Sequence, residues 1–252
     1  MSRTVFPGAE ALAEEAAQRF AQAAGDAINA RGTFVVALSG GTTPRSLYAQ
    51  LAGPRYASSV PWPLVQVLWG DERCVAPDHA ASNYRMAREV LLDHVPIPAA
   101  NVHPIHGEDD PTAAARAYEQ TLRSVLGTPQ GPPRDTPEAR IDLVLLGLGN
   151  DGHTASLFPG APVVTVGEPW VVAHRTPIEL SWRVTLTPVI INAAAEILFL
   201  VSGAGKAAIV QRVLEGPLRP DELPAQLIAP THGRVHWLLD AAAARDLERL
   251  TA

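Results

Sequence analysis

Short runs of apolar residues alternate along this chain with longer stretches whose apolar positions recur at helical spacing. The apolar runs predict strands at 34–38, 65–69, 141–146, 170–173, 183–186, 197–201 and 235–239. The other stretches predict helices at 7–31, 44–51, 82–94, 111–126, 188–195 and 204–214, and one more helix after the last strand. Several runs are apolar at nearly every position, as in strands buried on both faces. The pattern therefore predicts a doubly wound, Rossmann-like α/β fold, with a mainly parallel sheet and helices on both of its faces.

Local signals refine this layout. Ser82 precedes its helix and is a typical N-cap residue. The first helix is expected to break near Gly25, because glycine is a poor helix former. The stretch 127–140 is rich in proline and glycine and is the clearest loop. It is too short to mark a domain boundary, so we expect a single α/β domain over 1–252.

Composition and charge narrow the classes of function. The net charge is -6 without a block of like charges, which argues against a nucleic-acid partner and against a membrane surface. No apolar stretch reaches the roughly 18 residues of a membrane span, and the N-terminus lacks a signal-peptide core. The single cysteine, Cys74, excludes an internal disulfide and a cysteine metal cluster. We expect a cytoplasmic protein without a bound metal.

The segment 146–158, LGLGNDGHTASLF, carries the strongest sign of chemistry. Its glycines allow a sharp turn after a buried strand, which is where open α/β sheets bind their ligands. Asp151 and His153 lie two positions apart in this turn, with Asn150 beside them. Histidine gains or loses a proton near neutral pH. The segment therefore indicates an enzyme in which His153 is an acid or a base.

The same turn contains GLGNDG at 147–152, which matches the GxGxxG pattern of dinucleotide-binding proteins. That pattern needs a long helix to begin at once, so that the helix N-terminus can hold a pyrophosphate. Only a few residues precede Pro159 and Gly160, which end any helix here. An acidic residue should also follow a second strand about 20 positions on, whereas Glu168 precedes an apolar run. We therefore expect no dinucleotide cofactor.

The segment 38–45, LSGGTTPR, joins a predicted strand to a predicted helix. Gly40 and Gly41 expose backbone N–H groups, Thr42 adds a hydroxyl, and the N-terminus of a helix favours an anion. The Walker pattern GxxxxGK[ST] is absent from the sequence. A plain strand-to-helix turn needs one glycine and not this whole set, so we predict a phosphate-binding loop.

Two further strand ends carry charged residues. The segment 69–75, WGDERCV, contains Asp71 and Arg73. By itself it is more typical of a structural ion pair, although an arginine guanidinium suits bidentate phosphate contacts. The segment 201–207, VSGAGKA, begins a helix with Lys206, the only lysine in an arginine-rich chain. The helix dipole disfavours a cation there, which an anion nearby would explain; a solvated surface lysine is the alternative.

The carboxyl ends of parallel strands lie at one edge of a sheet, so all four turns are expected to line one crevice. A phosphate loop, two basic residues and a histidine in one crevice indicate a phosphorylated small molecule as the substrate. We expect its anion to bind between 40–42 and Lys206, with His153 further along the crevice.

These motifs resemble those of the 6-phosphogluconolactonases. SGGTTP at 39–44, GDER at 70–73, GLGNDGHTASLFP at 147–159 and GK at 205–206 occur in the order typical of that family. The resemblance implies a carboxylic ester hydrolase that converts 6-phospho-D-glucono-1,5-lactone to 6-phosphogluconate in the pentose phosphate pathway, without a cofactor. It also implies that His153 is a general base that activates water, and that Arg73 and Lys206 bind the phosphate.

In that mechanism we expect Asp151 to orient the imidazole of His153 and to stabilise its charged form. Asn150 or neighbouring backbone N–H groups are expected to bind the oxyanion. Further hydrogen-bond donors to the phosphate are expected from the loop residues Gly40, Gly41 and Thr42.

Two alternative functions stay open. Glucosamine-6-phosphate deaminases share the phosphate loop and the DGH turn, but they typically carry an MDEY-type segment and asparagine-glutamate residues after the histidine turn. This chain has GDER at 70–73 and SLFP at 156–159, which favours the lactonase, although Asp71 would be the base at C2 in a hexose-phosphate deaminase or isomerase. The third interpretation is a non-catalytic sugar-phosphate sensor, but the chain has no spare DNA-binding module. We expect a monomer whose only partner is a small phosphorylated sugar lactone.

Overall fold

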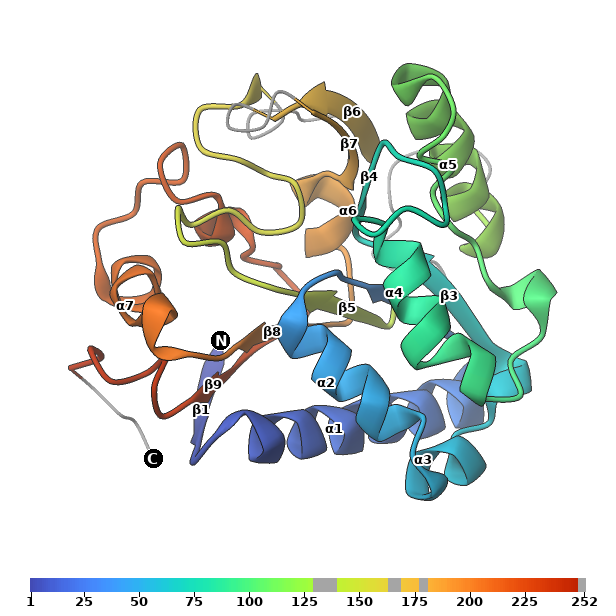
Figure 1. Ribbon diagram of the computed structural model, residues 1–252, viewed down its shortest axis with the longest axis horizontal. Helices are drawn as coiled ribbons and strands as arrows, with labels where there is room; N and C mark the ends of the chain where they lie inside the picture. The colour runs from blue at the N-terminus through green and yellow to red at the C-terminus, as the bar shows by residue number, and fades with distance from the viewer. Residues whose placement is uncertain (129–139, 163–168, 177–180, 249–252) are drawn as a thin grey trace.

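The computed structural model describes residues 1–128, 140–162, 169–176 and 181–248 (Figure 1). Most of the predicted loop at 127–140 lies outside these residues. Within them, no helix is long and apolar enough to cross a membrane.

Six strands form one parallel sheet in the order β1-β9-β8-β5-β2-β3. They are β1 (Ser2–Phe6), β2 (Phe34–Leu38), β3 (Val65–Trp69), β5 (Leu143–Leu146), β8 (Glu196–Val201) and β9 (Arg234–Asp240). Five of these strands lie where the apolar runs predict them. The sixth, β1, was not predicted, because three of its five residues are polar and it pairs only with β9 at the edge of the sheet.

Helices cover the sheet, which confirms the predicted α/β class (Figure 1). They are α1 (Ala9–Arg31), α2 (Thr42–Leu51), α3 (Pro54–Ser59), α4 (Asn83–Val90), α5 (Pro111–Val125), α6 (Pro188–Asn192) and α7 (Ala207–Glu215). Short 3₁₀ turns lie at 62–64, 92–94, 99–101, 204–206 and 224–227. Aromatic residues join the layers: Phe20 of α1 meets Phe34 of β2 edge-on, with ring centroids 5.3 Å apart.

Two details of the helix predictions have clear outcomes. Ser82 caps α4 as expected, since its Oγ accepts a hydrogen bond from the N–H of Arg85 at 3.1 Å. The break expected at Gly25 is wrong, because α1 runs unbroken through it. Phe20 and Ala24 on the same helix are fully buried, and this packing outweighs the poor helix propensity of one glycine.

A second, antiparallel sheet was not predicted. It has the order β4-β7-β6 and consists of β4 (Asp71–Arg73), β7 (Trp182–Leu186) and β6 (Val171–Arg175). The runs at 170–173 and 183–186 do form strands, but these strands lie outside the parallel sheet. β4 begins two residues after β3 ends, so the second sheet extends the main sheet at its carboxyl edge, where it holds the charged segment 71–73.

The helix expected after the last strand is also wrong, because the described residues 241–248 form turns. The carboxylate of Asp240 accepts hydrogen bonds from the backbone N–H groups of Gly203 and Ala243. These bonds hold the segment after β9 against the turn after β8. The bond from the N–H of Ala243 to the carboxylate three residues earlier is of the kind that caps the start of a helix, but the described chain after it continues only as turns.

Candidate active site

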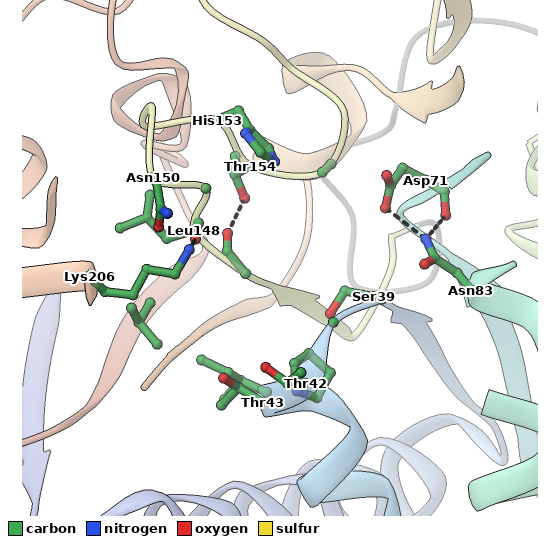
Figure 2. Close-up of a pocket in the computed structure, with 18 of the residues that line it drawn as sticks. Ser39, Thr42, Thr43, Asp71, Asn83, Leu148, Asn150, His153, Thr154 and Lys206 are labelled. Carbon is green, nitrogen blue, oxygen red and sulfur yellow. Dashed lines mark hydrogen bonds between the residues drawn. The ribbon is translucent and has the colours of Figure 1, made fainter. Parts of the chain in front are cut away.

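The parallel sheet reverses its direction of winding between β2 and β5. From β2 the chain proceeds to β3 on one side, and from β5 it proceeds to β8 and β9 on the other. The segments that leave β2 and β5 therefore diverge and open a crevice at the carboxyl edge. A cavity of about 470 Å³ lies there, lined by residues of all four predicted turns, which confirms that these turns converge. The lining includes Ser39, Gly40, Gly41, Thr42, Thr43, Asp71, Arg73, Asn83, Asn150, Asp151, His153, Thr154 and Lys206 (Figure 2).

His153 is oriented by Asp151. The Nδ1 of His153 lies 2.6 Å from Oδ1 of Asp151, which also accepts the backbone N–H of His153 at 3.2 Å. Burial tends to raise the pKa of Asp151, but the hydrogen bond and the charge of His153 outweigh it and lower that pKa. An ionised Asp151 accepts a hydrogen bond from the Nδ1–H of His153, so the lone pair of a neutral His153 is on Nε2. This is the tautomer that a general base needs.

Three contacts hold the turn around His153 in place. The imidazole packs on the ring of Phe158, with centroids 4.4 Å apart. The hydroxyl of Thr154 donates to the carbonyl of Gly147 at 2.8 Å, which closes the turn on itself (Figure 2). Gly149 lies against the imidazole so closely that a Cβ there would be 2.0 Å from His153 Nδ1. The side chain of His153 therefore has little freedom to leave its place in the crevice.

The N-terminus of α2 is built to receive an anion. Gly41, its N-cap residue, has φ +107° and provides no side chain to cap the helix. In the described part of the chain, the N–H groups of Gly41, Thr42 and Thr43 donate to no backbone or side-chain acceptor. They face the cavity with the positive end of the helix dipole behind them.

Lys206, the only lysine in the sequence, lines the same cavity as this helix end. It precedes α7, and its Nζ donates to the carbonyl of Leu148 at 2.7 Å, which leaves two N–H donors for a ligand (Figure 2). Burial lowers the pKa of Lys206, while the negative charge of Asp151 opposes that shift. A half-buried cation of this kind gains from a bound anion, so the surface-lysine alternative is disfavoured.

Asp240 holds the turn from which Lys206 projects. Its carboxylate accepts the hydroxyl of Ser202 at 2.5 Å and the N–H of Gly203 at 3.0 Å. Burial by itself would raise the pKa of Asp240, but these hydrogen bonds and that of Ala243 outweigh it and lower the pKa.

This network predicts a pH-dependent contribution to stability. A lowered pKa means that the ionised form of Asp240 stabilises the fold above the pKa of an unfolded aspartate, about 3.9, and that the contribution disappears as the pH falls through the lower, folded-state value. Asp240→Asn should therefore lower Tm at pH 7, and the difference from the wild-type Tm should shrink as the pH falls below about 4. Thermal melts followed by circular dichroism across pH 3–7 measure this. An equal difference at every pH would contradict it.

In the charged segment after β3, the two neighbouring acids have different surroundings. Glu72 is buried and accepts the N–H groups of Asn83 and Tyr84 and the hydroxyl of Ser82, so it fastens the start of α4 to β4. Burial raises the pKa of Glu72, and it outweighs the backbone hydrogen bonds, which act to lower that pKa. Asp71 points toward the cavity instead, and its carboxylate accepts the hydroxyl of Ser156 at 2.6 Å.

Arg73 also lines the cavity, and its Nη1 donates to the carbonyl of Ala81 at 2.6 Å. This bond fixes the guanidinium but leaves other N–H groups for a ligand. Asn150 is exposed at the mouth of the cavity, on the same turn as His153.

Sequence reasoning missed several polar residues at the cavity wall, among them Asn83, Ser39 and Thr154. Asn83 donates to the backbone carbonyl of Asp71 at 2.9 Å and lies so close to Gly40 that a Cβ there would be 1.9 Å from its Oδ1. Ser39 and Thr154 also line the cavity. No motif points to Asn83, because its position depends on how α4 packs against β4. Ser39 and Thr154 lie within segments that the analysis did identify.

Metal ligands are not grouped at this site. In the ranges that the structure describes, no three or more His, Cys, Asp or Glu side chains gather as candidate ligands.

Comparisons with known proteins agree with this architecture. The model of the family "Glucosamine-6-phosphate isomerases/6-phosphogluconolactonase" matches residues 7–237. A 6-phosphogluconolactonase of Synechocystis sp. is 41% identical over 222 residues, which are 88% of each chain. The solved 6-phosphogluconolactonase from Trypanosoma cruzi is 28% identical with a TM-score of 0.82, over 98% of this chain and 97% of that one. A monomeric glucosamine-6-phosphate deaminase, 24% identical with a TM-score of 0.80, covers 98% of this chain and 100% of its own, and shares the fold. The chain belongs to the glucosamine-6-phosphate isomerase/6-phosphogluconolactonase family.

Proposed function

We propose that this chain hydrolyses 6-phospho-D-glucono-1,5-lactone to 6-phospho-D-gluconate in the oxidative pentose phosphate pathway. Relatives at 41% and 40% identity, each matched over 88% of this chain, are named 6-phosphogluconolactonase. One observation carries the proposal: His153, held by Asp151 and with no hydrogen-bond partner for its Nε2 among the described residues, shares a cavity with a half-buried lysine and with a helix N-terminus that those residues leave uncapped. A base and an anion site in one cavity suit a substrate with a phosphate at one end and a reactive carbonyl at the other.

In the proposed reaction, Nε2 of His153 takes a proton from water as the water oxygen bonds to C1 of the lactone. The tetrahedral intermediate then collapses, the bond between C1 and the ring oxygen breaks, and the imidazolium returns its proton to that oxygen. The carboxylate of Asp151 stabilises the imidazolium between these two transfers. Asn150 or a backbone N–H of the same turn donates to the oxyanion that forms at C1.

The 6-phosphate is assigned to the opposite end of the cavity. The N–H groups of Gly40, Gly41 and Thr42 would donate to its oxygens, and Lys206 and Arg73 would neutralise its charge. In the part of the chain that the structure describes, the N–H groups of Gly41 and Thr42 have no acceptor, so they are available to the phosphate, and His153 is left for C1.

The proposed function is tested by a pH-stat or coupled assay on freshly prepared lactone, with the enzyme-free rate subtracted because the lactone also opens unaided. We expect turnover well above that rate. The deaminase alternative is tested by incubating the same protein with glucosamine 6-phosphate and measuring the release of ammonia. We expect no ammonia. Ammonia release without lactone turnover would overturn the proposal and would favour Asp71 as a base at C2.

Gly149 provides a test that adds one methyl group beside the base. In Gly149→Ala the new Cβ would meet His153 Nδ1 at 2.0 Å and Asp151 Oδ1 at 2.6 Å, so the pair must separate. We expect kcat to fall by roughly 10-fold or more, because the base loses its alignment, with little change in KM. The matched control is Gly147→Ala in the same turn, where a Cβ meets nothing within 4 Å. Equal kcat in both variants would mean that the contact with Gly149 does not position His153.

Several sequence-based expectations stay predictions, among them a single domain, a monomer, a cytoplasmic location and the absence of a nucleic-acid partner.

A further inference from the structure

Ser156 lies three residues after His153, and all three strands of the second sheet hold it. Its Oγ donates to the carboxylate of Asp71 on β4 at 2.6 Å. Its backbone N–H donates to Oγ1 of Thr185 on β7 at 3.2 Å, and its carbonyl accepts Nε2 of His174 on β6 at 2.6 Å. The three strands lie side by side (Figure 1). Each polar group of Ser156 is therefore fixed by a side chain from outside its own turn.

The residue before it, Ala155, has a strained backbone. Its φ is +47°, and among the described residues it is the only one other than glycine with a positive φ. This left-handed conformation is unfavourable for alanine because its Cβ crowds the following carbonyl oxygen, and it persists only where surrounding contacts enforce it. The three bonds to Ser156 act on one side of Ala155. On the other side, the hydroxyl of Thr154 is held by the carbonyl of Gly147.

The position of Ser156 affects His153 from two directions along the chain. His153 precedes Ser156 by three residues, and Phe158, whose ring packs on the imidazole, follows it by two. Between them, the N–H of Leu157 donates to the carbonyl of Thr154 at 2.9 Å, so these residues form one tight turn. A shift of Ser156 would thus move both the imidazole and the ring on which it packs. Catalysis is sensitive to such shifts, since a displacement of about 1 Å can cost on the order of 10²-fold in rate.

We propose that Ser156 is a positioning residue of the candidate active site, through which the second sheet holds Ala155 in its left-handed conformation and keeps His153 in place at the cavity. This inference rests on the proposed function, because it takes His153 to be the base that activates water. Thr185 and His174 are not among the residues that line the described cavity, so they act on the reaction only through Ser156.

The first test is Thr185→Val, which replaces the acceptor of the Ser156 N–H by a methyl group. We expect kcat for the lactone to fall roughly 10-fold or more, because His153 loses its alignment. KM, and the Kd of 6-phosphogluconate by isothermal titration calorimetry, should stay at the wild-type values, because Thr185 does not line the cavity. Rates are measured well below the Tm of the variant, so that unfolding does not contribute.

The matched control is Thr187→Val. Both threonines are fully buried, but the hydroxyl of Thr187 donates to the carbonyl of Pro169 at 2.8 Å, and neither of these residues lines the described cavity. Thr187→Val should lower Tm, because a buried hydrogen bond is lost, and it should leave kcat unchanged. If Thr185 had a purely structural role, Thr185→Val would behave in the same way.

His174 provides a second test outside the buried core, because this residue is only half-buried. His174→Ala removes the donor to the Ser156 carbonyl and should also lower kcat without changing the Kd of 6-phosphogluconate. His174→Gln should keep most of the wild-type kcat, because its side-chain amide can donate in place of Nε2.

The inference would be overturned by wild-type kcat in either Thr185→Val or His174→Ala, or by an equal loss of kcat in the control Thr187→Val. A rise in the Kd of 6-phosphogluconate as large as the fall in kcat would also overturn it, because the whole cavity would then be disturbed. Failure of the proposed function is recognised separately, since it appears as absent lactone turnover in the wild-type chain.

Discussion

Replacing His153 by alanine is expected to lower kcat by roughly 10²–10⁴, the usual contribution of a positioned general base. KM should change little, because the proposed phosphate contacts lie on α2, β4 and the turn before α7 and not on the histidine turn. The measurement is the initial rate of lactone opening across a range of substrate concentrations, corrected for spontaneous hydrolysis. The residual rate should come from binding and from the oxyanion donors alone.

A suitable control is His94→Ala. His94 is exposed and contacts the backbone of Glu89 outside the cavity, so its loss should leave kcat unchanged.

Asp151→Asn tests the residue that orients His153, because an amide cannot stabilise the imidazolium. It should lower kcat with little change in KM. Near-normal turnover in His153→Ala would remove His153 from the mechanism and would leave no other histidine in the described cavity lining to replace it.

Removing the charge of Lys206 should have the second large effect. A hydrogen bond to a charged group contributes roughly 1.5–3 kcal/mol, so Lys206→Ala should lower kcat/KM for the phosphorylated lactone about 10- to 150-fold. Arg73→Ala should act in the same direction. Glucono-1,5-lactone without the phosphate should lose much less in both variants. If both lactones lost activity equally, the assignment of these cations to the phosphate would be wrong.

The composition of the chain allows a second measurement at Lys206. Since it is the only lysine, an amine-directed reagent can modify only Lys206 and the N-terminus. Burial lowers its pKa, which raises the neutral, reactive fraction of the amine at a given alkaline pH. We expect 6-phosphogluconate to slow modification of Lys206 without affecting the N-terminus, and peptide mass spectrometry separates the two. Equal rates with and without the ligand would argue that no anion binds at Lys206.

It was predictable that all four turns line one cavity, because each turn is marked by a local feature of the sequence. Glycines after apolar runs mark strand ends, and parallel strands send all their carboxyl ends to one edge, whatever the order of the strands. His153, Lys206 and the loop 40–42 therefore reach one cavity by a rule that needs no knowledge of which strands are neighbours. The strand order was still required to explain why a crevice opens there, between β2 and β5.

The roles of Asp71 and Glu72 were not predictable. They are adjacent in sequence and have the same charge, yet Asp71 faces the cavity and Glu72 caps α4. Successive side chains point to opposite faces of a strand. Which of these two carboxylates lines the cavity therefore depends on which face of β4 meets the cavity. That is decided by the pairing of β4 with β7, more than 100 residues later in the chain. A three-residue strand carries too little periodicity to reveal this pairing.

By itself, the sequence determined the α/β class, five of the six parallel strands, and a histidine, a lysine and a glycine-rich loop that belong to one site. These follow from spacing and glycine content, which act over a few residues. Only the tertiary structure decided that a second sheet holds 71–73 and that Asn83 reaches the cavity wall. Each of these depends on contacts between elements distant in the chain, and such contacts are set by packing and hydrogen-bond satisfaction across the whole fold.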